Sequence, residues 1–143
     1  MRWEKPPSGW VKCNTDGAFY EQQGQGATGA VLRNDTGDFL RGGAKWYNHC
    51  LDALSMEALA CRDGLALALQ TGIQKVWQKV WLETDCQEIV KLWQAGVNQR
   101  SSVVSIIKEI RELSTLFQDF KFCFVCRSCN KLAHALASQK GHR

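Results

Sequence analysis

The hydrophobic pattern of the chain changes its period near Leu51, and this change constrains the fold more than any other feature. Before Leu51, three segments alternate apolar and polar residues between glycine-rich turns, as β-strands do: residues 11–19, 27–34 and 39–48. From Leu51 to Gln70, apolar side chains recur every three or four residues, which is typical of an α-helix. The sequence therefore predicts three consecutive antiparallel strands followed by a helix.

The second half of the chain alternates short strands and helices. Two segments rich in aromatic and β-branched residues predict strands: residues 79–85 and 119–127. Three segments with helical spacing predict helices: residues 86–96, 102–117 and 130–140. The first of these helices is expected to end at Gly96, and Asn130 is expected to cap the last one. The chain is thus predicted to be a mixed α/β protein.

Length and composition favour one domain. The chain has 143 residues, of which 45% are hydrophobic and 22% charged, as in an ordinary globular protein. No internal repeat, low-complexity tract or linker interrupts it. We expect a single domain over residues 1–143, in which residues 1–10 form an extended lead-in because Pro6 and Pro7 disfavour a helix.

Charge and cysteine content limit the partners and the compartment. The formal net charge of +4 is compatible with a polyanionic partner but far below that of a basic tail. No apolar run reaches the roughly 18 residues that a membrane helix needs, and no secretory signal pattern opens the chain. The number of cysteines is odd, which favours reduced thiols in the nucleus or cytoplasm: Cys13, Cys50, Cys61, Cys86, Cys123, Cys126 and Cys129. We therefore expect an intracellular protein, and we expect it to be a monomer.

Three carboxylates lie in apolar segments of successive predicted elements. Asp16 lies in the strand-like VKCNTDGAF, Glu57 in the helix-like SMEALACRDGLALAL, and Asp85 ends the strand-like KVWLETD. Buried acidic groups are costly unless cations neutralise them, and carboxylate oxygens suit hard divalent ions. The pattern predicts a divalent-metal site. Glu83 shares a strand face with Asp85 and is either a neighbouring ligand or an ion-pair partner.

Each of the three carboxylates also has a purely structural interpretation. Asp16 precedes Gly17 and could form a turn. Glu57 could lie on the solvated side of its helix, and Asp85 could cap the helix that follows it. Because all three occur in this order on the appropriate elements, we favour the metal site.

Several motifs follow one another from Trp3 to about Ala137. They are W-x-x-P-x-x-G-W-x-K-x-N-x-D-G-A at the start, E-A-L-A in the first helix, T-D before Cys86-Gln87, and R-x-x-N-x-x-A-x-x-L-A near the end. Together they resemble the ribonuclease H domain, and more narrowly its plant retroelement-derived branch, found in non-LTR reverse transcriptases and as stand-alone proteins. The resemblance implies a five-stranded mixed sheet in the order 3-2-1-4-5 with helices on both faces.

The resemblance also implies an activity. Ribonuclease H hydrolyses the RNA strand of RNA/DNA hybrids by a two-metal mechanism with Mg²⁺, which Mn²⁺ can replace, and leaves 5′-phosphate and 3′-hydroxyl ends. Asp16, Glu57 and Asp85 match the metal ligands of the family. His134 stands where active members usually offer a fourth carboxylate, and imidazole is a poor ligand for Mg²⁺. We therefore expect activity that is reduced, shifted toward Mn²⁺, or lost.

Substrate recognition is expected to depart from the family pattern. Gly17, Ala18 and Gln87 match positions that contact nucleic acid in the family. The asparagines that read 2′-hydroxyl groups just before the helix glutamate are missing, because residues 53–56 read Ala-Leu-Ser-Met. Hybrid recognition should be weaker. The alternative function is a catalytically weak or inactive retroelement-derived module that binds nucleic acid or protein.

A second metal motif is weaker. Cys126-x₂-Cys129-x₄-His134 copies the first three ligands of a zinc knuckle, but the fourth would fall at Gln139. The segment also reads as a strand that leads into a helix. We interpret its cysteines as thiols of a packed core.

Overall fold

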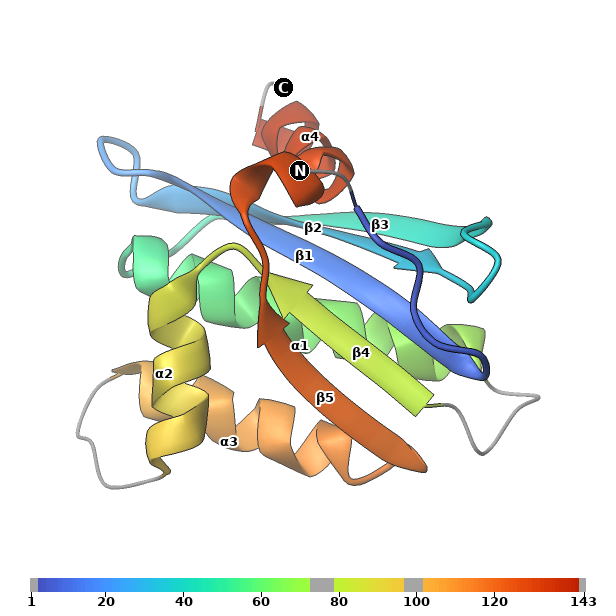
Figure 1. Cartoon of the computed structure of the whole chain (residues 1–143). Helices are drawn as coiled ribbons and strands as arrows, with labels where there is room; N and C mark the ends of the chain where they lie inside the picture. Colours follow the sequence, from blue (N-terminus) through green and yellow to red (C-terminus); the bar gives the residue numbers. More distant parts are fainter. Residues whose placement is uncertain (1–2, 73–78, 97–101, 142–143) are drawn as a thin grey trace.

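The chain folds into three strands, a helix, a strand, two helices, a strand and a final helix (Figure 1). This computed structural model describes residues 3–72, 79–96 and 102–141. The order of the elements is the predicted one, with one short 3₁₀ turn added before the last helix. Within the described residues, no helix has the length and apolar character needed to cross a membrane.

Five strands form one mixed sheet in the order β3-β2-β1-β4-β5, as predicted. β1 (Trp10–Tyr20) pairs antiparallel with β2 (Gln25–Arg33), and β2 pairs antiparallel with β3 (Phe39–Tyr47). On its other side, β1 runs parallel to β4 (Lys79–Thr84), and β4 runs parallel to β5 (Asp119–Phe124). The central strand β1 is therefore hydrogen-bonded on both sides.

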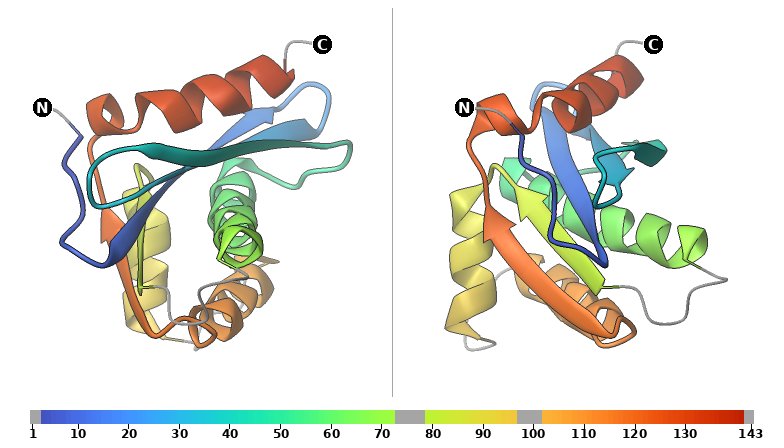
Figure 2. Two further views of the ribbon diagram at one scale, coloured as in Figure 1. Left: turned by 90° about the vertical axis from the view of Figure 1, so that its right-hand side faces the viewer. Right: turned by 45° about the vertical axis from the view of Figure 1, so that its right-hand side comes forward.

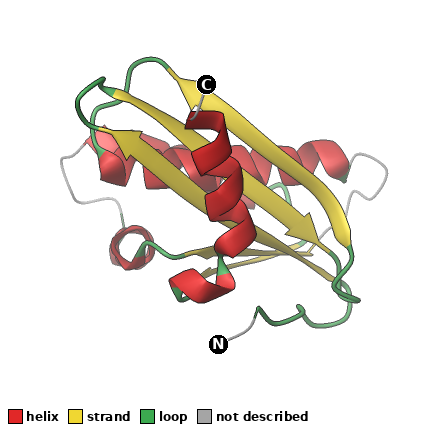
Figure 3. Ribbon diagram, turned by 90° about the horizontal axis from the view of Figure 1, so that it is seen from above, coloured by secondary structure: helices red, strands yellow, loops and turns green. Residues whose placement is uncertain are grey.

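Helices cover both faces of the sheet, as Figures 2 and 3 show. α1 (Ala53–Thr71) packs against β1 and β2, α3 (Ser102–Ser114) packs against α1, and α2 (Gln87–Ala95) contacts β5. α4 (Lys131–Gly141) crosses the opposite face over β1, β2 and β3. The predicted fold class is confirmed.

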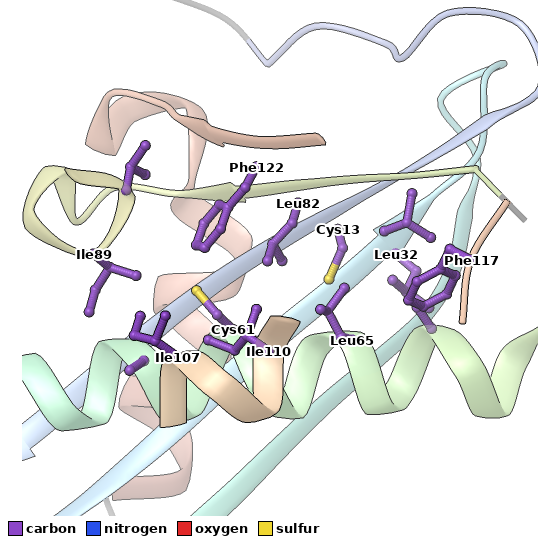
Figure 4. Close-up of a cluster of buried hydrophobic side chains, with 14 of the residues drawn as sticks. Cys13, Leu32, Cys61, Leu65, Leu82, Ile89, Ile107, Ile110, Phe117 and Phe122 are labelled. Carbon is purple, nitrogen blue, oxygen red and sulfur yellow. The ribbon is translucent and has the colours of Figure 1, made fainter. Parts of the chain in front are cut away.

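The main hydrophobic core lies between the sheet and the α1–α3 layer (Figure 4). Burial of each such apolar side chain stabilises the fold by about 1.5–3 kcal/mol. The core combines side chains from the sheet, from α1 and α2, and from α3 and the turn after it: Cys13, Leu32, Leu82, Phe122, Cys61, Leu65, Ile89, Ile107, Ile110 and Phe117.

Two glycines let helices approach the sheet closely from opposite faces. A Cβ atom on Gly17 would lie 2.6 Å from the carbonyl carbon of Met56 in α1. A Cβ atom on Gly29 would overlap the backbone of α4. Any larger side chain at either position would push a helix away from the sheet. These contacts place the helices that carry Glu57 and His134 directly against the two central antiparallel strands.

β5 and α3 each end three residues earlier than the sequence predicted. β5 ends at Phe124, because the chain turns into the 3₁₀ helix η1 (Arg127–Cys129), in which the Cys129 N–H donates to the Cys126 carbonyl at 3.0 Å. α3 ends at Ser114, because the following residues form tight turns with hydrogen bonds between residues three apart. Hydrophobic spacing continues across both turns and therefore hides these boundaries.

Candidate metal centre

Strand pairing places Asp16 beside Asp85. β1 and β4 run parallel, and Thr15 of β1 is the register partner of Thr84 of β4. The next residue along each chain is an aspartate, Asp16 within β1 and Asp85 directly after β4. Residues at equivalent positions of neighbouring parallel strands project to the same face. The register of the sheet thus brings the two carboxylates together.

Glu57 reaches the same place from α1. The backbone N–H of Gly17 donates to Glu57 Oε1 at 2.6 Å, which fixes one carboxylate oxygen against β1. The ligand atoms of Asp16, Glu57 and Asp85 all lie within 4.8 Å of one another. The structure therefore brings together three predicted site residues from a strand, a helix and a strand end. We call these three residues the carboxylate cluster.

Two oxygens of the carboxylate cluster are buried without hydrogen-bond partners in the part of the chain that the structure describes. They are Glu57 Oε2 and Asp85 Oδ2. Arg127 Nε lies 3.8 Å from Asp85 Oδ2, but the Arg127 side chain is 84% exposed, and such ion pairs are weak. Buried anionic oxygens without donors are costly, and carboxylate oxygens are the ligands that Mg²⁺ prefers. The carboxylate cluster therefore fits a hard divalent cation.

Burial and repulsion from Asp16 raise the pKa values of two members of the carboxylate cluster, Glu57 and Asp85. The pKa of Glu57 is raised to about 9, first by burial and then by Asp16, although the hydrogen bond from Gly17 lowers it. The pKa of Asp85 is also raised, first by burial and then by Asp16, while Arg127 and Asn130 lower it. Without a cation the cluster therefore holds a proton at neutral pH. A bound cation would replace that proton.

Glu83 belongs to a separate group of side chains, in which it is an ion-pair partner. Its Oε2 lies 3.2 Å from Lys12 Nζ, and its Oε1 accepts a hydrogen bond from Asn14 Nδ2 at 2.9 Å. Burial raises the pKa of Glu83, while Lys12 and Asn14 lower it. Both oxygens of Glu83 therefore have partners inside the protein. We call Lys12, Asn14 and Glu83 the lysine cluster.

Asn130 connects the two clusters, a role that the sequence reasoning missed. It directly precedes α4, as predicted, but the hydrogen bonds of its side chain run to β1. Its Nδ2 donates to the Thr15 carbonyl at 2.7 Å, and its Oδ1 accepts from Asn14 Nδ2 at 3.1 Å. The residue is almost fully buried. The R-x-x-N motif was the available signal, because Arg127 and Asn130 both lie beside Asp85.

His134 lies on α4, which covers the face of the sheet opposite α1, and contacts Asp16 of the carboxylate cluster. Its Nδ1 lies 2.6 Å from Asp16 Oδ2, and its side chain is 54% exposed. The imidazole thus contacts a carboxylate that a metal ion would also use. Among the described residues, the carboxylate cluster is the only group of three or more side chains placed to hold a metal ion. Cys126, Cys129 and His134 therefore do not form a metal site together.

The three residues predicted to contact nucleic acid are partly or fully exposed in the structure. Gly17 and Ala18 continue β1 beyond Asp16 and are partly exposed. Gln87 is exposed at the first position of α2, two residues after Asp85. In the segment that lacks asparagines, residues 53–56, Ser55 and Met56 are buried. All three predicted contact residues therefore lie within a few positions of a cluster carboxylate along the chain.

Comparisons with known proteins identify the family. The model of the reverse transcriptase-like family matches residues 14–140, and the chain belongs to this family. The chain is 29% identical over 136 residues to a protein of Arabidopsis thaliana that is provisionally named a ribonuclease H protein. The match covers 95% of this chain and 21% of that protein, so the chain spans about a fifth of the length of this relative.

Solved structures give the same result for the fold. Ribonuclease H1 of Halobacterium salinarum NRC-1 is 25% identical, with a TM-score of 0.78 over 94% of this chain and 98% of that one. LC11 ribonuclease H1, isolated from compost and crystallised with an RNA/DNA hybrid, is 17% identical, with a TM-score of 0.81 over 93% and 99%. The expected ribonuclease H-like fold is confirmed.

Proposed function

We propose that residues 1–143 form one ribonuclease H-like domain that hydrolyses the RNA strand of RNA/DNA hybrids with bound Mg²⁺, for which Mn²⁺ can substitute. The convergence of Asp16, Glu57 and Asp85 within 4.8 Å carries the proposal. Two of these carboxylates, Glu57 and Asp85, have a buried oxygen that lacks a donor among the described residues. Such a set of carboxylates suits a site for divalent cations. We place the domain, as a monomer, in the nucleus or cytoplasm, where thiols stay reduced.

The surrounding residues prepare the carboxylates for this role. Gly17 holds Oε1 of Glu57, so that Oε2 stays available to a cation. Arg127 and Asn130 lower the pKa of Asp85 and favour its charged form. Asp16 would bind a cation together with Glu57 and Asp85. Bound divalent cations supply activation of the attacking water and stabilisation of charge on the leaving 3′ oxygen.

The substrate class rests on the fold neighbours and on the surface beside the carboxylates. A protein of the same fold, LC11 ribonuclease H1, was crystallised with an RNA/DNA hybrid. In this chain Gly17 and Ala18 would lie along the RNA strand, and the exposed Gln87 would reach the groove. Because residues 53–56 offer no amide side chains, discrimination against duplex DNA should be modest and binding should be sensitive to salt.

A second candidate function is supported by the contact between His134 and Asp16. The 2.6 Å distance between Nδ1 and Oδ2 engages a carboxylate oxygen that a metal ion would need. An imidazole also adds no negative charge to the site, so one metal position is weakened. In this case the chain is a weak or inactive relative of the enzyme that binds nucleic acid or a protein.

A hybrid-cleavage assay separates the two candidates. A labelled RNA/DNA hybrid is incubated with wild type, with Asp16→Asn and with Asp63→Asn, in Mg²⁺ and in Mn²⁺. Asp63 is the matched control, because its carboxylate accepts hydrogen bonds from Thr28 and Tyr47 instead. We expect cleavage that Asp16→Asn abolishes and Asp63→Asn retains. Binding of the hybrid without cleavage in either metal would favour the second candidate.

A further inference from the structure

A pair of thiols on the turn between β5 and α4 lies close enough to form a disulfide. The sulfur atoms of Cys126 and Cys129 are 3.3 Å apart. The Cys129 N–H donates to the Cys126 carbonyl at 3.0 Å, which holds the two ends of the turn together. A disulfide bond is about 2.0 Å long, so the sulfurs need to approach by roughly 1.3 Å. Rotation of the two side chains can supply such a movement.

Cys126 has the surroundings of a reactive thiol. Its Sγ lies 3.1 Å from Ser128 Oγ, and hydrogen bonding to Ser128 and Cys129 lowers the pKa of the Cys126 thiol. The thiolate is the nucleophile in thiol chemistry. Burial instead raises the pKa values of five other thiols: Cys13, Cys50, Cys61, Cys86 and Cys123.

A small reagent has room to reach the pair. Cys126 and Cys129 border a hollow of about 540 Å³, whose other walls come from the lysine cluster, the N-terminal lead-in and the end of β5. Both cysteines are partly exposed, whereas Cys13 and Cys61 are fully buried in the core. Access and thiolate character therefore coincide at Cys126.

We propose that Cys126 and Cys129 form a reversible disulfide site that reacts with low-molecular-weight disulfides. The Cys126 thiolate attacks one sulfur of the small disulfide, forms a mixed disulfide and releases one thiolate, which takes up a proton. The Cys129 thiolate then attacks the Cys126 sulfur, forms the intramolecular bond and releases the second thiol. The protein dithiol loses two electrons and two protons, and the small disulfide gains them as two thiols.

The position of this site gives its oxidation a structural consequence. Arg127 lies between the two cysteines and pairs with Asp85 at 3.8 Å, and Asn130 directly follows Cys129 and bonds to the Thr15 carbonyl. Disulfide formation therefore acts on the backbone that carries two neighbours of the carboxylate cluster. The chemistry of the thiols does not depend on metal binding or on nuclease activity.

Peptide mapping tests the proposal on the whole chain. Wild-type protein is incubated with oxidised glutathione, remaining thiols are alkylated, and the protein is cleaved after arginine and lysine. Cleavage after Lys121, Arg127 and Lys131 leaves Cys126 with Cys123 in one peptide and Cys129 in the next. We expect these two peptides to be joined by a disulfide that fragmentation of the joined peptides assigns to Cys126 and Cys129. Cys129→Ser should trap the mixed disulfide at Cys126, and Cys126→Ser should slow modification at position 129 by about tenfold. Cys50→Ser is the matched control and should leave the crosslink unchanged.

The proposal is overturned if glutathione distributes evenly over the partly exposed Cys50, Cys123 and Cys126, with no peptide that joins 126 to 129. A crosslink between Cys126 and Cys123 in place of Cys129 would overturn it as well. Circular dichroism shows whether each variant is folded. If a variant fails to fold, the wild-type peptide map alone still decides between these outcomes.

Discussion

Two buried acidic sites lie two residues apart at the end of β4 and handle their charge in opposite ways. In the lysine cluster, both oxygens of Glu83 have internal partners, Lys12 and Asn14. In the carboxylate cluster, Glu57 Oε2 and Asp85 Oδ2 are buried without donors among the described residues. A carboxylate that is paired inside the protein serves the structure. A set of carboxylates without such partners keeps a proton or binds a cation from solution.

The N-terminal lead-in completes the lysine cluster. Lys12 Nζ donates to the Glu4 carbonyl at 2.6 Å, and Trp3 Nε1 donates to Asn14 Oδ1 at 2.8 Å. Lys12 also lies 5.2 Å from the ring centre of Trp3 and 5.3 Å from that of Trp81. The tryptophan, lysine and asparagine of the opening motif are therefore structural. Asp16 of the same motif belongs to the carboxylate cluster, and Gly17 donates a hydrogen bond to Glu57.

Removal of the internal cation should have the largest effect on the lysine cluster. Lys12→Met leaves the Glu83 carboxylate buried without its ion-pair partner and should lower the free energy of unfolding by about 3–5 kcal/mol. Urea denaturation measures this change. The double variant Lys12→Met with Glu83→Gln is the control and should recover part of the loss. If Lys12→Met alone is neutral, Glu83 does not depend on its internal partner and the contrast between the clusters fails.

Addition of a fourth carboxylate should make the carboxylate cluster less stable without metal and more active with Mg²⁺. His134→Asp adds negative charge beside Asp16, so it should lower the metal-free melting temperature and raise Mg²⁺-dependent cleavage. One added carboxylate ligand should raise that rate about tenfold or more, equivalent to about 1.4 kcal/mol of transition-state stabilisation. The gain should be smaller in Mn²⁺, which accepts imidazole more readily. Unchanged cleavage in both metals with an intact fold would remove His134 from the site.

The pH dependence of stability should separate metal-free from metal-bound protein. Because the pKa of Glu57 is raised from 4.5 to about 9 in the folded state, its protonated form stabilises the metal-free fold at low pH. That contribution should be lost progressively as pH rises through this range, while stabilisation by Mg²⁺ should increase. Melting curves between pH 5 and pH 9 test this, with Glu57→Gln as the control that flattens the profile. If the metal-free stability of the wild type instead rises with pH, while that of Glu57→Gln does not, the raised pKa of Glu57 is contradicted.

The sequence predicts the fold and the carboxylate cluster well for a physical reason. Strand alternation and helical spacing identify the elements, and the parallel register then forces Asp16 beside Asp85. Hydrogen bonds between distant residues leave no such periodic signal. The contact of Asn130 with β1 and the pairing of Glu83 with Lys12 depend on side-chain geometry, so neither follows from spacing along the chain.

The most direct test makes the same chemical change, carboxylate to amide, in each cluster: Asp85→Asn in the carboxylate cluster and Glu83→Gln in the lysine cluster. Each removes one buried negative charge, and melting temperatures are measured with and without millimolar Mg²⁺. We predict that Asp85→Asn raises the metal-free melting temperature and reduces the stabilisation by Mg²⁺, because it relieves repulsion and removes a ligand. Glu83→Gln should lower the metal-free melting temperature and retain the Mg²⁺ response. Equal destabilisation by both variants, with no Mg²⁺ response in wild type, would contradict the account.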